Sequence, residues 1–242
     1  LVLVISLVMG WEWCRVVRGP GIDLSLIVQS LAVTAAVALA GFGMAALGVA
    51  VLIIGTFIVL ALEFDSHPIL SSVGVLYAGL PAVALLWLRS NEPMGFKAVL
   101  FIALVVAATD TAAFAAGRLI GGPRLAPSIS PNKTWSGLVG GVLAAGLCAA
   151  VFAYAITAPV AALAVTGLLM GLVAQAGDLA ESALKRAFNV KDASDLLPGH
   201  GGFMDRMDGI VAVTVVVALA VLFLDPQAPA GALFAGLAGV GP

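Results

Sequence analysis

Eight apolar runs, most of them long enough to cross a membrane, limit what this chain can fold into more than any other feature. A helix that spans the hydrocarbon core of a bilayer needs about 20 mostly apolar residues. The runs cover residues 1–10, 24–42, 44–62, 71–88, 98–117, 136–156, 159–177 and 209–224. Because hydrophobic residues make up 62% of the chain, an ordinary water-soluble domain is excluded. The sequence therefore predicts an all-α, polytopic integral membrane protein with about eight transmembrane helices.

The two ends of the chain differ from the runs between them. Residues 1–10 have neither the charged start nor the cleavage site of a signal peptide, so we expect a truncated first transmembrane helix. Beyond Asp225 the chain is rich in Ala, Gly and Pro, and we expect an interfacial or frayed end. Since no linker or internal repeat divides the sequence, residues 1–242 are predicted to form a single membrane-embedded domain.

The basic residues fall almost entirely on one set of loops. Of the 11 Lys and Arg residues, all but Arg89 and Lys97 lie in alternate loops. Lys and Arg near membrane segments are retained on the cytoplasmic side. The segments predicted to face the cytoplasm are 11–23, 63–70, 118–135 and 178–208. A net charge of −2 provides no broad basic surface, so nucleic acid is excluded as a partner and the lipid bilayer is the expected surroundings.

Polar chemistry is concentrated in residues 178–208. A helix over residues 175–189 would place Asp178, Ser182 and Lys185 on one face, with Glu181 and Arg186 close by. Carboxylates can hold Mg²⁺ while leaving positions for phosphate and water, and Lys or Arg neutralises phosphate charge. The face therefore fits a metal–phosphate complex. A solvated helix with intrahelical ion pairs is the alternative.

A second acidic group, Asp205 and Asp208, enters the last apolar run. Their spacing of three lets both side chains reach one centre if the helix begins by Asp205. Acidic residues also favour the N-terminal end of a helix, which can account for one of the two. The preceding segment, residues 198–202, reads PGHGG; its backbone amides can cradle phosphate, or it can be a plain turn.

Two further segments carry polar residues beside apolar runs. Asp110 lies inside a run, where a carboxylate must be paired or reach water; pairing with Arg118 is the structural alternative. Residues 130–134, with the sequence SPNKT, lie on a predicted cytoplasmic loop. An ordinary turn followed by a helix cap would explain them without a functional role.

Together these motifs resemble the phosphatidate cytidylyltransferase family, also called the CDP-diacylglycerol synthases. The resemblance covers about residues 11–224 and is most specific at 178–208. It rests on Ser182, Lys185-Arg186, Lys191-Asp192, residues 198–202, Asp205-Arg206 and Asp208, and on the blocks around Asp110 and Lys133. Ser136 departs from the family, which has Glu or Gln there. Glu12, between two tryptophans expected at the membrane interface, matches a Trp/Glu pair found early in the family.

The resemblance implies a membrane nucleotidyltransferase of phospholipid biosynthesis that joins CTP to phosphatidic acid and releases pyrophosphate. It implies the bacterial inner membrane, an active site facing the cytoplasm, and a homodimer. We assign Asp178, Asp205 and Asp208 to Mg²⁺, with room for a second metal ion, and add Lys185 to form the catalytic set. The expected substrate-binding residues are Asp110, Asn132, Lys133, Thr134, Ser182, Arg186, Lys191, Asp192, His200, Gly201 and Arg206. Ser182 is expected to contact phosphate or the metal shell rather than act as a nucleophile.

Other functions remain open at this point. An ion-coupled transporter also places charges at helix ends and inside spans, but does not need a dense polar segment on one membrane face. A CTP-dependent polyprenol kinase would release CDP rather than pyrophosphate. A CDP-alcohol phosphotransferase is disfavoured because its Asp-Gly-x-x-Ala-Arg block is absent. Glu63, Asp65 and His67 could suggest a metal site, but we interpret them as loop residues.

Overall fold

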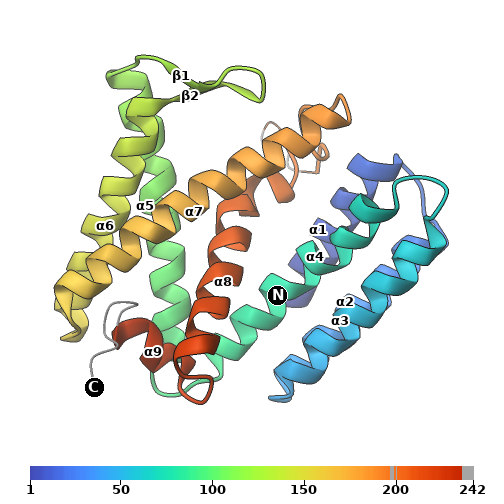
Figure 1. Ribbon diagram of the computed structural model, residues 1–242, viewed down its shortest axis with the longest axis horizontal. Helices are drawn as coiled ribbons and strands as arrows, with labels where there is room; N and C mark the ends of the chain where they lie inside the picture. Colours follow the sequence, from blue (N-terminus) through green and yellow to red (C-terminus); the bar gives the residue numbers. More distant parts are fainter. Residues whose placement is uncertain (197–198, 200, 236–242) are drawn as a thin grey trace. The chain divides into compact units, whose positions relative to one another are not determined.

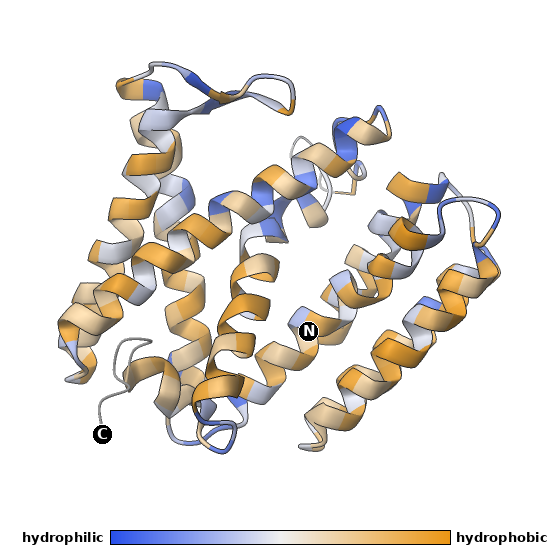
Figure 2. Cartoon of the chain, viewed as in Figure 1, coloured by the Kyte–Doolittle hydropathy of each residue, from blue (hydrophilic) through white to orange (hydrophobic). Residues whose placement is uncertain are grey.

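The computed structural model describes residues 1–196, 199 and 201–235 (Figure 1). Its helices are α1 (Val2–Arg18), α2 (Leu24–Gly41), α3 (Ala45–Leu62), α4 (Pro68–Arg89), α5 (Gly95–Leu119), α6 (Trp135–Ile156), α7 (Val160–Ala187), α8 (Met204–Leu224) and α9 (Pro229–Ala235). Within the described residues, seven helices, α2 to α8, are long and apolar enough to cross a membrane. Figure 2 shows apolar residues along these helices. The prediction of an all-α, polytopic integral membrane protein is confirmed.

The helices differ from the predicted runs mainly at their ends. α1 includes the run 1–10 but continues to Arg18. α7 continues past the run 159–177 to Ala187, as predicted for residues 175–189. α8 begins at Met204, so Asp205 lies in its first turn. The helix therefore starts early enough for the side chains of Asp205 and Asp208 to reach one centre, which was the condition set by the sequence.

Two short elements were not predicted. Strands β1 (Arg124–Ala126) and β2 (Ser130–Thr134) form an antiparallel pair in the connection between α5 and α6. The segment 130–134 is therefore a strand rather than a turn. α9 follows α8, and its Leu233 and Phe234 are buried. The Phe234 ring lies 5.8 Å from that of Phe101, so residues 229–235 are not a frayed end.

The chain divides into two compact units, which we call unit 1 and unit 2. Unit 1 contains Leu1–Ser90 and Leu184–Met207, and unit 2 contains Asn91–Ala183 and Asp208–Pro242. Both divisions in the second half of the chain fall inside helices, so α7 and α8 each contribute residues to both units. The prediction that residues 1–242 form one domain stays a prediction.

In unit 1, helices α1 to α4 pack closely because glycines replace side chains at the contacts. Gly74 on α4 leaves room for the Trp13 ring of α1, and Gly79 leaves room for Leu52 of α3. The Trp13 indole N–H donates to the Leu70 carbonyl oxygen at 2.8 Å. α1 is thereby fixed on α4, which determines where the polar residues of α1 lie.

Asp23 caps α2 at the surface of unit 1. Its carboxylate accepts the Leu26 N–H at 2.6 Å and pairs with the Arg18 guanidinium at 2.8 Å. Burial alone would raise the pKa of Asp23, but the hydrogen bonds from Arg18 and Leu26 outweigh it and lower the pKa below its usual value. The charged form is therefore the one that stabilises the fold.

We expect the contribution of Asp23 to stability to depend on pH in one direction. Because the folded-state pKa is lowered, this contribution is complete above the unfolded-state pKa and is lost as the pH falls through the folded-state pKa. At neutral pH, Asp23→Ala should cost about 1 kcal/mol, the usual value of an N-cap. Thermal unfolding in detergent between about pH 3 and 7 measures both effects. Asp65→Ala, at an exposed loop residue, is the control, and an equal loss in both variants would contradict the capping role.

Candidate active site

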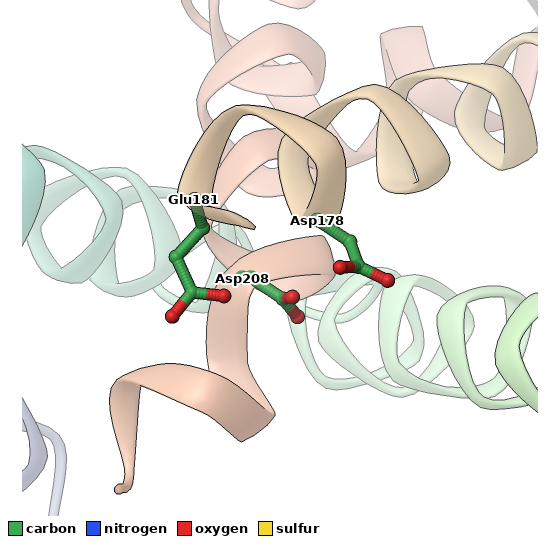
Figure 3. A group of neighbouring side chains, drawn as sticks. All are labelled: Asp178, Glu181 and Asp208. Carbon is green, nitrogen blue, oxygen red and sulfur yellow. The ribbon is translucent and has the colours of Figure 1, made fainter. Parts of the chain in front are cut away.

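Three carboxylates meet in unit 2 where α7 approaches α8. Asp178 and Glu181 come from α7 and Asp208 from α8, and their ligand atoms all lie within 4.8 Å of one another. Figure 3 shows the three side chains gathered on facing sides of the two helices. Among the described residues, no other group of three or more His, Cys, Asp or Glu has this geometry. The cluster can hold a divalent metal ion, since carboxylate oxygens are the ligands that hard cations prefer.

Two glycines beside the acids let the helices come this close. A Cβ at Gly177 would lie 2.5 Å from the Ala212 Cβ and 3.0 Å from the Asp208 carbonyl oxygen. A Cβ at Gly209 would lie 3.5 Å from the Ala174 Cβ of α7 and 3.1 Å from Val106 of α5. The sequence thus places a small residue next to Asp178 and another next to Asp208. The short distance between α7 and α8 brings their carboxylates to one point.

A lysine and a hydroxyl complete the immediate surroundings of Asp178. The Lys133 ammonium lies 2.6 Å from an Asp178 carboxylate oxygen, and the Ser182 hydroxyl donates to the other oxygen at 3.4 Å. Lys133 lies on β2, so the hairpin, which the sequence did not predict, positions this ammonium group beside the acidic cluster. Of the three acids predicted to bind the metal, the structure brings Asp178 and Asp208 together, with Glu181 as the third member of the cluster.

The residues around Lys133 have structural roles as well. The Thr134 hydroxyl accepts the Gly137 N–H at 3.1 Å and caps α6, so the capping interpretation holds for Thr134. The Ser136 hydroxyl donates to the Gly121 carbonyl oxygen at 2.5 Å. Ser136 stands where the family has a longer acid or amide, and its hydrogen bond links the start of α6 to the segment that precedes the hairpin. Asn132 is exposed on β2, and Asp110 is exposed on α5.

A separate polar group lies in unit 1. The Lys185 ammonium forms an ion pair with Asp205, and the two side chains are only 11% and 10% exposed. The same carboxylate accepts the Ala193 N–H at 3.0 Å and the Gly202 N–H at 2.8 Å. Three donors thus hold Asp205 in place. Its predicted role as a metal ligand stays a prediction, whereas its pairing with Lys185 is observed.

Comparison with known proteins decides the family. The model of the Cytidylyltransferase family matches residues 1–224.

The chain belongs to the cytidylyltransferase family.

Curated relatives agree with this assignment. The phosphatidate cytidylyltransferase of Brucella suis biovar 1 (strain 1330) is 42% identical over 187 residues, which are 76% of this chain and 68% of the relative. That of Rickettsia bellii (strain RML369-C) is 35% identical over 153 residues, 60% of this chain and 66% of the relative. The resemblance inferred from the motifs at 178–208 is thus confirmed, and the chain is a membrane-bound member of a nucleotidyltransferase family.

Within this cytidylyltransferase, the remaining predicted site residues are mostly exposed. The exposed ones are Arg186, Lys191, Asp192 and Arg206. The Arg186 guanidinium donates to the Val190 carbonyl oxygen at 3.1 Å. Gly201 has a φ of +79°, which favours glycine. His200 lies outside the described residues.

Two acids, Glu181 and Glu12, have contacts in the structure that point to roles not predicted from the sequence. Glu181 stands three residues after Asp178 on the same helical face, and this spacing was the available signal for a third ligand. Glu12 is completely buried in α1. A single acid within an apolar, Trp-flanked segment was its signal, because a buried charge requires partners.

Proposed function

We propose that this cytidylyltransferase condenses CTP with phosphatidate to give CDP-diacylglycerol and pyrophosphate. The observation that carries the proposal is the cluster of Asp178, Glu181 and Asp208 beside Lys133. It stands on two helices that continue into apolar spans. A lipid substrate must be reached from the bilayer, and a triphosphate needs metal and cations. The names of the curated relatives supply the two substrates.

The reaction joins two anions, so charge neutralisation and positioning supply most of the acceleration. A phosphatidate oxygen attacks the α-phosphorus of CTP in line, the new P–O bond forms, and the bond to the β-phosphate oxygen breaks as pyrophosphate leaves. No covalent enzyme intermediate is required. Ser182, which donates to Asp178, therefore orients that carboxylate rather than attacking phosphorus.

The residues of unit 2 fit a divalent metal by the chemistry of their donors. Asp178, Glu181 and Asp208 would hold it, and we propose Mg²⁺ because three carboxylates suit a hard cation that also binds substrate phosphates. When bound, the ion neutralises phosphate charge at the reacting centre. Lys133 stays beside Asp178 and presents its ammonium to a phosphate oxygen.

Four basic residues of unit 1, Lys185, Arg186, Lys191 and Arg206, keep the phosphate-binding role that the sequence predicts for them. Lys185 is held by Asp205, and Arg186, Lys191 and Arg206 are exposed. Asp205 orients Lys185 in this arrangement, and metal binding by Asp205 is a second role that substitution can test. The distribution of Lys and Arg supports an active site on the cytoplasmic face, and the bacterial origin of the relatives supports the proposal of a bacterial inner membrane. Assembly as a homodimer is a further proposal.

Removal of the metal is expected to stop the reaction. Detergent-purified protein should release pyrophosphate from CTP only with phosphatidate and Mg²⁺ present. A chelator should lower the rate by more than about 100-fold, because losing a metal exceeds the effect of losing an outer-shell partner. Adding Mg²⁺ should restore the rate.

The products of this assay separate the proposal from its rivals. A CDP-lipid formed together with pyrophosphate supports nucleotidyl transfer, whereas free CDP with a phosphorylated lipid would indicate a kinase. Solute uptake into liposomes without consumption of CTP would indicate a transporter. Either of the last two results overturns the proposed function.

A further inference from the structure

Glu12 is a charged side chain in α1 that the reaction described above does not use. It is 0% exposed. Its carboxylate accepts three hydrogen bonds within unit 1, from the Ser194 hydroxyl at 2.5 Å, the Phe203 N–H at 2.8 Å and the Met204 N–H at 2.6 Å. A buried carboxylate is tolerated only when such donors compensate it, so these contacts define its role.

The donors belong to a loop and to the first turn of α8. Ser194 lies in the connection between α7 and α8, and Phe203 and Met204 lie where α8 begins. The first N–H groups of a helix have no partner within the helix and attract negative charge. Glu12 therefore caps α8 from a position 191 residues earlier in the chain.

The contacts of Glu12 run parallel to those of Asp205. Asp205 joins Ala193 to Gly202 through their N–H groups. Glu12 joins the next residue on each side, Ser194 and Phe203. Each carboxylate thus links the same two parts of the chain, and the two links are one residue apart. The position of Asp205, and of the Lys185 paired with it, therefore depends on the hydrogen bonds that Glu12 accepts.

Two adjacent glycines of the loop, Gly201 and Gly202, provide independent support. A Cβ at Gly202 would lie 2.7 Å from a Glu12 carboxylate oxygen, and a Cβ at Gly201 would lie 3.0 Å from an Asp205 carboxylate oxygen. Each glycine therefore makes room for one of the carboxylates. Within the segment 198–202, for which the sequence allowed a phosphate cradle or a plain turn, Gly201 and Gly202 are thus required by the protein's own acids.

We infer that Glu12 is a positioning residue of the active site. It fixes Ser194, Phe203 and the start of α8, and through them it holds Lys185 and Asp205 in the arrangement that binds substrate phosphates. This inference rests on the proposed function, because Lys185 and Asp205 belong to the machinery assigned there.

The first test compares Glu12→Gln with Gln29→Leu. Glu12→Gln keeps the size of the side chain but replaces one accepting oxygen by an NH₂ group that faces donors. It should lower kcat/KM for CDP-lipid formation by about 10–100-fold, the effect of losing a residue that orients a ligand. Gln29 is buried against the neighbouring turn of α1, where its amide donates to the Gly10 carbonyl oxygen at 3.0 Å. Gln29→Leu should lower the melting temperature and leave kcat/KM near that of the wild type.

A double-mutant cycle separates positioning from simple loss of packing. Gly202→Ala should strongly lower kcat/KM in the wild-type background, because the new methyl group meets the Glu12 carboxylate. In a Glu12→Ala background only the contact with the Ala193 Cβ, at 3.1 Å from the new Cβ, remains, so the same change should have a clearly smaller further effect. Equal effects of Gly202→Ala in both backgrounds, or a Glu12→Gln variant with wild-type kcat/KM, would overturn the inference.

Hydrogen exchange keeps the test independent of the proposed reaction. The Phe203 and Met204 amides should exchange at least about 10-fold faster in Glu12→Gln than in the wild type, because opening of the capped turn becomes easier. Amides in the middle of α1 should be unchanged. If the wild type makes no CDP-lipid, the proposed function fails, and unchanged exchange at Phe203 and Met204 would show separately that Glu12 does not hold the loop.

Discussion

Replacing Asp208 by Asn is expected to lower the rate of CDP-diacylglycerol formation by more than about 100-fold, because a direct metal ligand should matter more than the outer-shell partners that cost about 10–100-fold. Asn keeps the shape of the side chain and one oxygen, which still accepts the Gly209 N–H as in the wild type (2.7 Å). The change therefore removes charge from the cluster with little effect on packing. Pyrophosphate release measures the loss of activity, and titration calorimetry with Mn²⁺ measures the loss of metal affinity.

The same substitution should stabilise the metal-free protein. Three carboxylates whose ligand atoms lie within 4.8 Å of one another repel each other, and neutralising one removes part of that repulsion. A higher melting temperature in chelator together with lost activity is the pattern expected of a functional cluster. Asp225→Asn, at an exposed residue beyond the other end of α8, should leave both quantities unchanged. A metal-free Asp208→Asn protein that is less stable than the wild type would contradict this account of the cluster.

Replacing Lys185 by Met should have the largest effect on stability. It leaves the Asp205 carboxylate, 10% exposed, without its cation, and breaking a buried ion pair from one side costs about 3–5 kcal/mol. We expect the lower end of this range, because the Ala193 and Gly202 amides still donate to Asp205. Thermal or denaturant unfolding in detergent measures the change, and CDP-lipid formation should be lost as well.

A second substitution separates the two consequences of losing Lys185. Adding Asp205→Asn to Lys185→Met removes the unpaired charge and should restore much of the stability, whereas activity should stay low because the phosphate-binding cation is still missing. Lys97→Met, at an exposed lysine near the start of α5, should change stability by less than about 0.5 kcal/mol, as surface substitutions do. Recovery of full activity in the double variant would remove Lys185 from the proposed machinery.

Much of the fold could be predicted because the bilayer imposes a simple length rule. The runs at 24–42 and 44–62, for example, correspond closely to α2 and α3. The hairpin of β1 and β2 and the short helix α9 escaped prediction for a common reason. Both are too short for a periodic signal, and tertiary contacts stabilise them, such as the Lys133–Asp178 ion pair and the packing of Phe234 on Phe101.

Spacing alone places Asp178, Ser182 and Lys185 on one helical face. It also suggested a centre shared by Asp205 and Asp208, whereas the structure groups Asp208 with Asp178 and Glu181 and pairs Asp205 with Lys185. Contacts between distant segments could not be derived in this way. No local rule links Glu12 to Phe203, since that contact depends on how α1 packs on α4 through Trp13 and Gly74.

The distance along the chain between Glu12 and its amide partners also sets an order of events during synthesis. Ribosomes add about 5–20 residues per second, so Phe203, 191 residues later, emerges about 10–40 s after Glu12. For that interval the growing chain holds an acid whose backbone donors have not yet been made. We therefore expect the hydrogen bonds of Glu12 with Phe203 and Met204 to be among the last contacts that the maturing protein forms.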